Sequence, residues 1–138
     1  MTLAAIASIT GGRLVGGDPA AEVRGFDFDS RVQTPGAGFV ALVDERDGHD
    51  YVAAAHAAGA AVALVARIPD GVVGPCVVVE DPLAALAALA RAARTDLAGT
   101  RVVAVTGSAG KTSTKELLAA ALAPARRVHA NAASYNNE

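Results

Sequence analysis

The residues with the clearest chemical potential lie between Thr106 and Thr112, in the run Thr-Gly-Ser-Ala-Gly-Lys-Thr. Its two glycines let backbone N–H groups approach a polyphosphate closely. Lys111 supplies a compact positive charge, and the Thr112 hydroxyl suits Mg²⁺. We therefore predict a phosphate-binding loop. The residues predicted to bind the nucleotide are Thr106, Gly107, Ser108, Ala109, Gly110, Lys111, Thr112 and Ser113.

A phosphate loop needs a strand before it and a helix after it. Val102–Val105 has the pattern of a short buried strand, and apolar residues recur at helical spacing from 117 to 122. The amino end of such a helix favours anions through its unpaired N–H groups and its dipole. The general motif has a further glycine where Val105 stands, so this is a shorter form. The alternative is an ordinary strand-to-helix turn with an exposed lysine.

The preceding residues alternate short apolar strands with helices, which indicates an α/β unit with a largely parallel sheet. Asp81 and Pro82 suit the N-cap and first turn of a long helix, and Thr2 suits the cap of a short one. Helices are expected over residues 3–9, 51–58 and 82–96. Strands are expected over 13–15, 23–29, 39–43, 61–65 and 76–79, with one more at 127–130.

The predicted fold class is α/β, with a small N-terminal α/β domain followed by the start of a P-loop parallel-sheet ATPase domain. We expect the first domain over 1–80, a connecting helix over 81–98 and the second domain over 99–138. A parallel sheet must be covered on both faces, and two strands with one helix cannot achieve this. We therefore expect the second domain to be incomplete and the chain to be the N-terminal part of a longer protein.

The composition excludes several classes of partner. The chain has 138 residues, a net charge of −2 and only 4% aromatic residues, which disfavours nucleic-acid binding by bulk charge or base stacking. No apolar run reaches the roughly 18 residues of a membrane span, and no secretory signal pattern begins the chain. A single cysteine, Cys76, excludes an internal disulfide and fits a buried strand. We expect a monomeric cytoplasmic protein.

Three stretches resemble the Mur ligases, the ATP-dependent amide-forming enzymes of peptidoglycan synthesis. They are Asp29-Ser30-Arg31 with residues 35–42, then residues 46–51 with 58–60, and finally 106–116 with 134–138. Within the family, the run from Lys111 to Glu116 and the ending Asn136-Asn137-Glu138 are most similar to members that join D-alanyl-D-alanine to UDP-N-acetylmuramoyl-tripeptide. The resemblance therefore implies these two compounds as substrates and ATP with Mg²⁺ as cofactors.

The resemblance also implies a mechanism and residue roles. The substrate carboxylate would attack the γ-phosphate of ATP, and an amine would then displace phosphate from the acyl phosphate. Lys111 would be the catalytic residue at the phosphates, and Thr112 the metal ligand. The C-terminal domain that brings the amine is missing, so we expect the 138 residues alone to be inactive. The implied substrate-binding residues are Ser30, Arg31, Asp47, Gly48, His49, Asn136 and Asn137.

Two of these residues, and the chain as a whole, have alternative interpretations. Arg31 could instead pair with Asp29 in a turn, and His49 could have a structural role by bonding a neighbouring backbone group. For the whole chain, the alternatives are another ligase of the same superfamily, or a nucleotide-sugar-binding module without catalysis.

Overall fold

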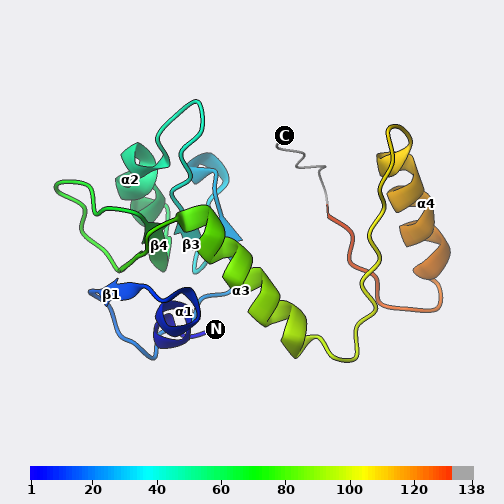
Figure 1. The fold of residues 1–138 in the computed structure, drawn as a ribbon, viewed down its shortest axis with the longest axis horizontal. Coiled ribbons are helices and arrows are strands. Elements are labelled where there is room, and N and C mark those ends of the chain that lie inside the picture. Colours follow the sequence, from blue (N-terminus) through cyan, green and yellow to red (C-terminus); the bar gives the residue numbers. More distant parts are fainter. Residues whose placement is uncertain (132–138) are drawn as a thin grey trace. The chain divides into compact units, whose positions relative to one another are not determined.

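The computed structural model describes residues 1–131, which divide into two compact units (Figure 1). The first unit comprises Met1–Ala98, and the second begins at Gly99. No helix among residues 1–131 is long and apolar enough to cross a membrane.

The first unit is built on one mixed five-stranded sheet with the order β1-β5-β4-β3-β2. Strands β2 to β5 run parallel, and β1 is antiparallel to β5. This arrangement confirms the prediction of an α/β unit with a largely parallel sheet. The strands are β1 (Arg13–Val15), β2 (Phe26–Asp27), β3 (Gly38–Val40), β4 (Val62–Val65) and β5 (Cys76–Val78).

Two strands are shorter than predicted because their backbone groups bond outside the sheet. The strand expected over 23–29 is confined to β2, since the Val23 amide donates to the Met1 carbonyl. The strand expected over 39–43 ends at Val40, and the Leu42 carbonyl beyond it accepts from the Gly48 amide. The first departure therefore comes from a contact between residues 22 positions apart, and the second from a contact within the loop that follows β3.

Two helices of the first unit begin at the predicted caps, Thr2 and Asp81, whereas the helix expected from Tyr51 begins at Val52 without a side-chain cap. The Thr2 hydroxyl accepts from the Ala5 amide at 3.2 Å, and the Asp81 carboxylate accepts from the Leu83 and Ala84 amides at 2.8 and 3.2 Å. Two short 3₁₀ helices were not predicted, and the second ends at Tyr51, the first residue of the helix expected over 51–58. The helices are α1 (Leu3–Thr10), η1 (Ser30–Val32), η2 (Gly48–Tyr51), α2 (Val52–Ala57) and α3 (Pro82–Asp96).

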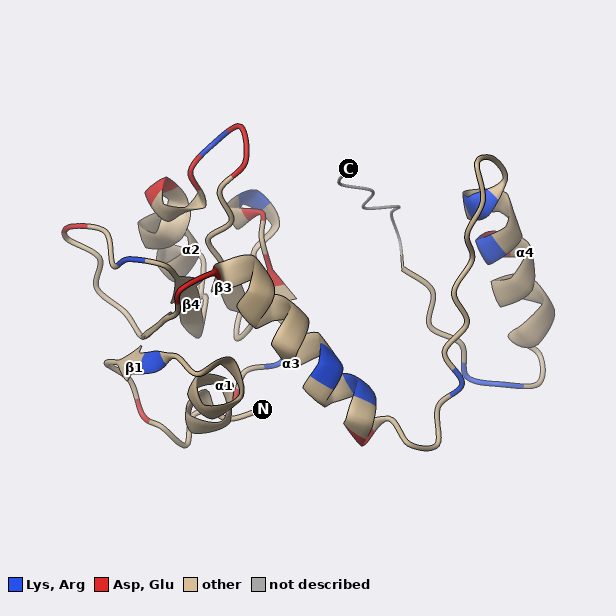
Figure 2. Cartoon of the chain, viewed as in Figure 1, with Lys and Arg blue, Asp and Glu red and all other residues tan. Residues whose placement is uncertain are grey.

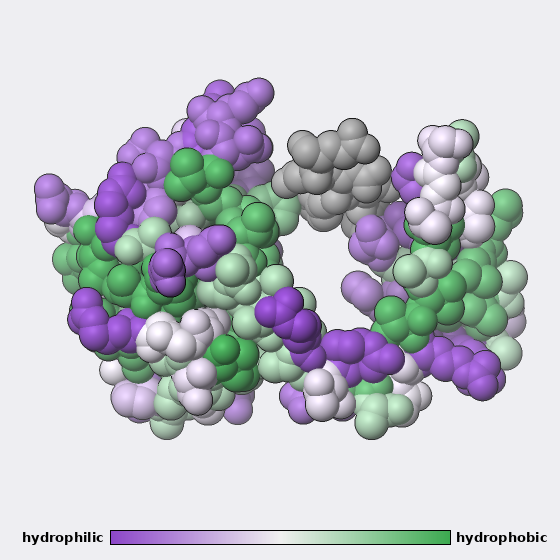
Figure 3. Space-filling view, in the orientation of Figure 1, coloured by the Kyte–Doolittle hydropathy of each residue, from purple (hydrophilic) through white to green (hydrophobic). Residues whose placement is uncertain are grey.

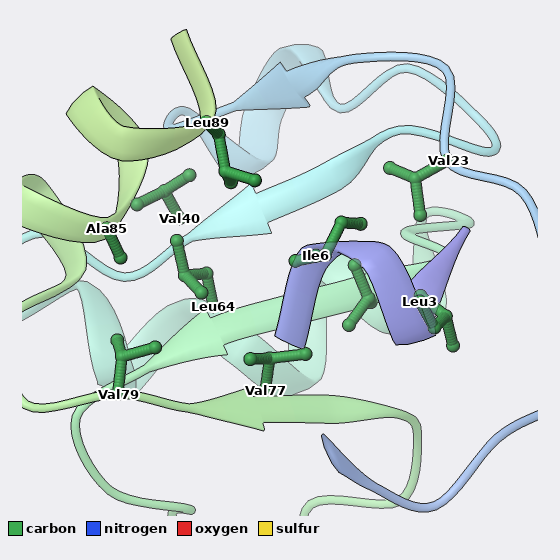
Figure 4. Close-up of a cluster of buried hydrophobic side chains, with 10 residues drawn as sticks. Leu3, Ile6, Val23, Val40, Leu64, Val77, Val79, Ala85 and Leu89 are labelled. Atoms are coloured by element: carbon green, nitrogen blue, oxygen red, sulfur yellow. The ribbon is translucent and has the colours of Figure 1, made fainter. Parts of the chain in front are cut away.

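Both faces of the sheet are buried. Strand β4 shows this most clearly, because Val62 and Leu64 join one hydrophobic cluster while Ala63 and Val65 join the other. The first cluster packs α1 and α3 against the sheet (Figure 4). The second packs α2 and contains Cys76, which is buried as predicted. Helices on both faces are what a parallel sheet requires.

The second unit contains one regular element in its described part, the helix α4 (Lys111–Leu122). The predicted strands at 102–105 and 127–130 are wrong, because neither segment is a strand. Val102 and Val103 are 59% and 61% exposed. A strand requires a neighbouring strand to satisfy its backbone groups, and residues 99–131 provide none. The start of a P-loop sheet is therefore not seen.

Candidate functional site

The predicted substrate-binding residues of the first unit follow the carboxyl ends of neighbouring parallel strands. Ser30 and Arg31 follow β2, and Asp47, Gly48 and His49 follow β3. Parallel neighbours end at the same edge of a sheet, and open α/β sheets bind ligands at that edge. Charged residues of this unit lie mostly in its loops (Figure 2). The part of this unit drawn at the top of Figure 3, where some of these loops lie, is hydrophilic. The structure therefore gathers these five residues at one edge.

Arg31 pairs with Asp29, as the turn alternative proposed. Its Nε lies 2.9 Å and its NH2 2.6 Å from the two oxygens of the Asp29 carboxylate, which also caps η1 by accepting from the Arg31 amide. The side-chain bonds from Arg31, followed by the backbone bond, lower the pKa of Asp29 to about 2. The Arg31 side chain remains 84% exposed, so the pairing orients the guanidinium without burying it. Ser30 beside it is half-buried.

His49 is buried, with only 2% of its side chain exposed. Its Nε2 lies 3.0 Å from the Ala66 amide, and its Nδ1 lies 2.6 Å from Oδ1 of Asp47. A backbone N–H can only donate, so Nε2 is the acceptor and Nδ1 carries the proton that goes to Asp47. Both ring nitrogens are therefore engaged within the protein, which matches the structural role considered for His49.

Asp47 accepts hydrogen bonds from three groups. The His49 amide donates to Oδ1 at 2.9 Å, the His49 ring donates to the same atom, and NH2 of Arg67 donates to Oδ2 at 2.8 Å. These bonds lower the pKa of Asp47 to about 2, with the His49 amide contributing most. Sequence reasoning missed Arg67. The available signal was its position directly after the predicted strand 61–65, at the same sheet edge.

Gly48 contributes through its backbone. Its amide donates to the Leu42 carbonyl at 2.7 Å. A Cβ at this position would lie 2.5 Å from the same oxygen, a separation that real Cβ atoms do not show. Only glycine therefore permits the close approach that folds the loop after β3.

The phosphate loop lies in the second unit and is exposed apart from the half-buried Lys111. Gly107 and Gly110 have φ angles of 151° and 77°, which favour glycine. Nζ of Lys111 donates to the Gly107 carbonyl at 2.5 Å, so the cation lies over the loop. Gly110 caps α4 without a side-chain acceptor, which leaves this helix end suited to an anion. The loop residues therefore fit a bound polyphosphate.

The remaining predicted residues are placed as follows. Thr106, Ser108 and Ala109 are exposed in the loop, and Thr112 and Ser113 are exposed in the first turn of α4. Thr112 is the predicted metal ligand, and its position two residues after the Gly110 cap is compatible with that role. Asn136 and Asn137 lie outside the described residues.

Comparison with known proteins gives consistent relatives, although no protein-family model matches the chain. UDP-N-acetylmuramoyl-tripeptide–D-alanyl-D-alanine ligases of Mycobacterium tuberculosis and Escherichia coli are 44% and 40% identical over 100% of this chain. The matches cover 32% and 30% of those proteins. The chain thus spans about a third of the length of these curated relatives. A UDP-N-acetylmuramoyl-L-alanyl-D-glutamate–2,6-diaminopimelate ligase of Bradyrhizobium diazoefficiens is 43% identical over 68% of the chain and 19% of the relative.

Solved structures agree with the sequence comparison. A crystal structure of MurF from Acinetobacter baumannii matches 90% of this chain and 28% of its own, with a TM-score of 0.76 and 35% identity. The MurF ligase from Thermotoga maritima in complex with ADP matches 77% of this chain and 24% of its own, with a TM-score of 0.61 and 36% identity.

Proposed function

This chain is a homologue of the UDP-N-acetylmuramoyl-tripeptide–D-alanyl-D-alanine ligases, and we propose that it provides the substrate-binding and ATP-binding parts of such a ligase. The reaction would join D-alanyl-D-alanine to UDP-N-acetylmuramoyl-tripeptide in peptidoglycan precursor synthesis, in a monomeric cytoplasmic enzyme. The observation that carries the proposal is the 40–44% identity to these ligases along 100% of the chain.

We assign nucleotide-sugar binding to residues 1–80, with 81–98 as the connecting helix. The Ser30 hydroxyl would bond to an edge of the uracil, and the Arg31 guanidinium would bind the diphosphate. Asp47, Gly48 and His49 would shape the neighbouring loop. This assignment is supported by the position of these residues at the carboxyl edge of the parallel strands.

We assign ATP binding to residues 99–138. ATP with Mg²⁺ would supply the phosphoryl group that activates the substrate carboxylate toward the amine. Backbone N–H groups of residues 107–110 would hold the phosphates, and Lys111 would exchange the Gly107 carbonyl for phosphate oxygens. Thr112 would bind Mg²⁺, with Thr106 and Ser113 beside the phosphates. Asn136 and Asn137 would contact the nucleotide sugar.

A coupled phosphate-release assay on the full-length protein tests the proposal. The mixture contains ATP, Mg²⁺ and UDP-N-acetylmuramoyl-tripeptide, with or without D-alanyl-D-alanine. We expect phosphate release only when the dipeptide is present. Release with another amine and none with the dipeptide would contradict the proposed specificity.

The Bradyrhizobium diazoefficiens relative supports a second candidate, addition of 2,6-diaminopimelate to UDP-N-acetylmuramoyl-L-alanyl-D-glutamate. It is the weaker candidate, since that match covers 68% of the chain rather than 100%. The same assay with these two substrates distinguishes it. Binding of the UDP substrate without phosphate release, whichever amine is present, would instead favour a non-catalytic binding module. Ligation by the 138 residues alone would contradict the proposal that this chain provides only the substrate-binding and ATP-binding parts of such a ligase.

A further inference from the structure

The loop after β3 is joined to the end of β4 by a closed ring of hydrogen bonds. The Ala66 amide donates to His49, the His49 ring donates to Asp47, and Arg67 donates to the other oxygen of Asp47. Because Ala66 and Arg67 are consecutive residues, a peptide unit closes the ring. The loop after β3 and the Arg67 guanidinium are therefore held in one geometry.

The ring also determines which groups remain for a ligand. The Ala66 amide sets the His49 tautomer, so Asp47 Oδ1 is occupied by the ring N–H and Oδ2 receives Arg67. The ring engages Arg67 through NH2, which leaves Nε and NH1 as further donors on a side chain that is 59% exposed. Arg31, in contrast, gives both Nε and NH2 to Asp29. Arg67 thus offers more donors than the arginine that the sequence singled out.

We propose that Arg67 binds the diphosphate of the nucleotide sugar together with Arg31, and that Asp47 and His49 position it. The inference rests on the proposed function. Arg31 follows β2 and Arg67 follows β4, and β3 lies between these two strands, so the two arginines lie on either side of the segment that follows β3. A diphosphate presents several charged oxygens, and a guanidinium binds such oxygens through paired N–H groups. Two guanidiniums at one sheet edge suit this ligand.

The experiment measures dissociation constants of UDP, UDP-N-acetylmuramoyl-tripeptide and uridine for the 138-residue chain, by calorimetry and by NMR titration for the weakest ligand. We expect R67Q to raise the dissociation constants of both diphosphate ligands roughly tenfold to a hundredfold, which is what the loss of a hydrogen bond to a charged group usually costs. The dissociation constant of uridine for R67Q should stay within about twofold of its value for the unchanged chain, because uridine has no phosphate. R67K should restore part of the loss, since it keeps the charge but not the paired donors.

R94Q is the matched control, because Arg94 is an exposed arginine in the last turn of α3, and it is the first turn of this helix that follows the carboxyl end of β5. We expect R94Q to leave all three constants unchanged, and R67Q to leave the thermal midpoint unchanged. D47N should weaken UDP binding less than R67Q, because Arg67 would remain present but less well oriented.

The outcomes separate the two proposals. If the unchanged chain and R67Q bind UDP with equal affinity, the proposed role of Arg67 is wrong, but the proposed nucleotide-sugar site is not contradicted. Equal weakening of uridine and UDP, with a lower thermal midpoint, would show a merely structural role for Arg67. Failure of the unchanged chain to bind any of the three ligands would overturn the nucleotide-sugar site itself.

Discussion

Gly48 and Leu42 approach each other so closely that the loop between them folds back on itself. The Gly48 amide bonds to the Leu42 carbonyl, and a short antiparallel bridge joins Val43 to Asp47 within the same loop. This turn brings Asp47 and His49 to the end of β3 and into contact with the end of β4. The local geometry at one glycine thus positions the candidate site.

We predict that Gly48→Ala lowers the free energy of unfolding by about 1–3 kcal/mol, because the added methyl group would overlap backbone atoms. Urea denaturation followed by circular dichroism measures this change. Gly25→Ala is the matched control, since a Cβ there meets nothing within 4 Å. Equal stability of the two variants would contradict the close approach at Gly48.

Removing the His49 ring should also destabilise the first unit. His49→Ala deletes a buried side chain and leaves the Ala66 amide and the Asp47 carboxylate without their partner. We expect a loss of about 2–4 kcal/mol in the free energy of unfolding. His129→Ala, at an exposed position of the second unit, should change it by less than about 0.5 kcal/mol. A His49→Ala protein as stable as this control would show that the ring of hydrogen bonds contributes little.

The Asp29–Arg31 pair should be visible in a carboxylate titration. The pKa of Asp29 is lowered to about 2, chiefly by the Arg31 side chain. We therefore expect Arg31→Gln to raise it toward the ordinary value of about 3.9, as followed by the carboxyl ¹³C shift. Because the folded-state pKa is the lower one, the pair stabilises the protein above about pH 4. That contribution is lost as the pH falls toward about 2.

Asp47 provides the internal comparison for this titration. Its pKa is also about 2, but the largest cause is the His49 amide, which is a backbone group. Arg67→Gln should therefore shift the Asp47 pKa less than Arg31→Gln shifts that of Asp29. An Asp47 pKa that returned fully to its ordinary value would contradict the dominance of the His49 bonds.

The two proposed sites should be separable in the full-length ligase. Lys111→Ala should reduce phosphate release by roughly 10²–10³-fold, because it removes the charge that stabilises the moving phosphoryl group. The dissociation constant of the UDP substrate should stay within about threefold, since Lys111 is assigned to the phosphates of ATP and most residues assigned to the UDP substrate lie in the other unit. Arg126→Ala, an exposed position after α4, is the control and should affect neither. An equal loss of phosphate release and of affinity for the UDP substrate in Lys111→Ala would contradict the two-site assignment.

Cys76 should be inert in the folded protein. Its side chain lies within the core cluster of the α2 face, and burial raises the pKa of its thiol. A thiolate-specific reagent should therefore react only as the protein unfolds in denaturant. Rapid labelling of the native chain would show that this core opens more readily than its packing indicates.

Local sequence determined much of this protein. Thr2 and Asp81 are followed by helices as predicted, because a capping side chain bonds to amides only two or three residues away. The alternation of apolar strands and helices likewise indicated the α/β unit, since burial periodicity is a property of neighbouring residues. The helix after the phosphate loop was predicted for the same reason.

Only the tertiary structure decided which distant residues meet. Arg67 pairs with Asp47 across 20 positions because β4 lies beside β3, and no local pattern records that order. His49 bonds to Ala66 for the same reason, and this contact joins the loop after β3 to the end of β4. Conversely, the apolar run at Val102 forms no strand within the described residues, because a strand depends on a partner that local sequence does not supply.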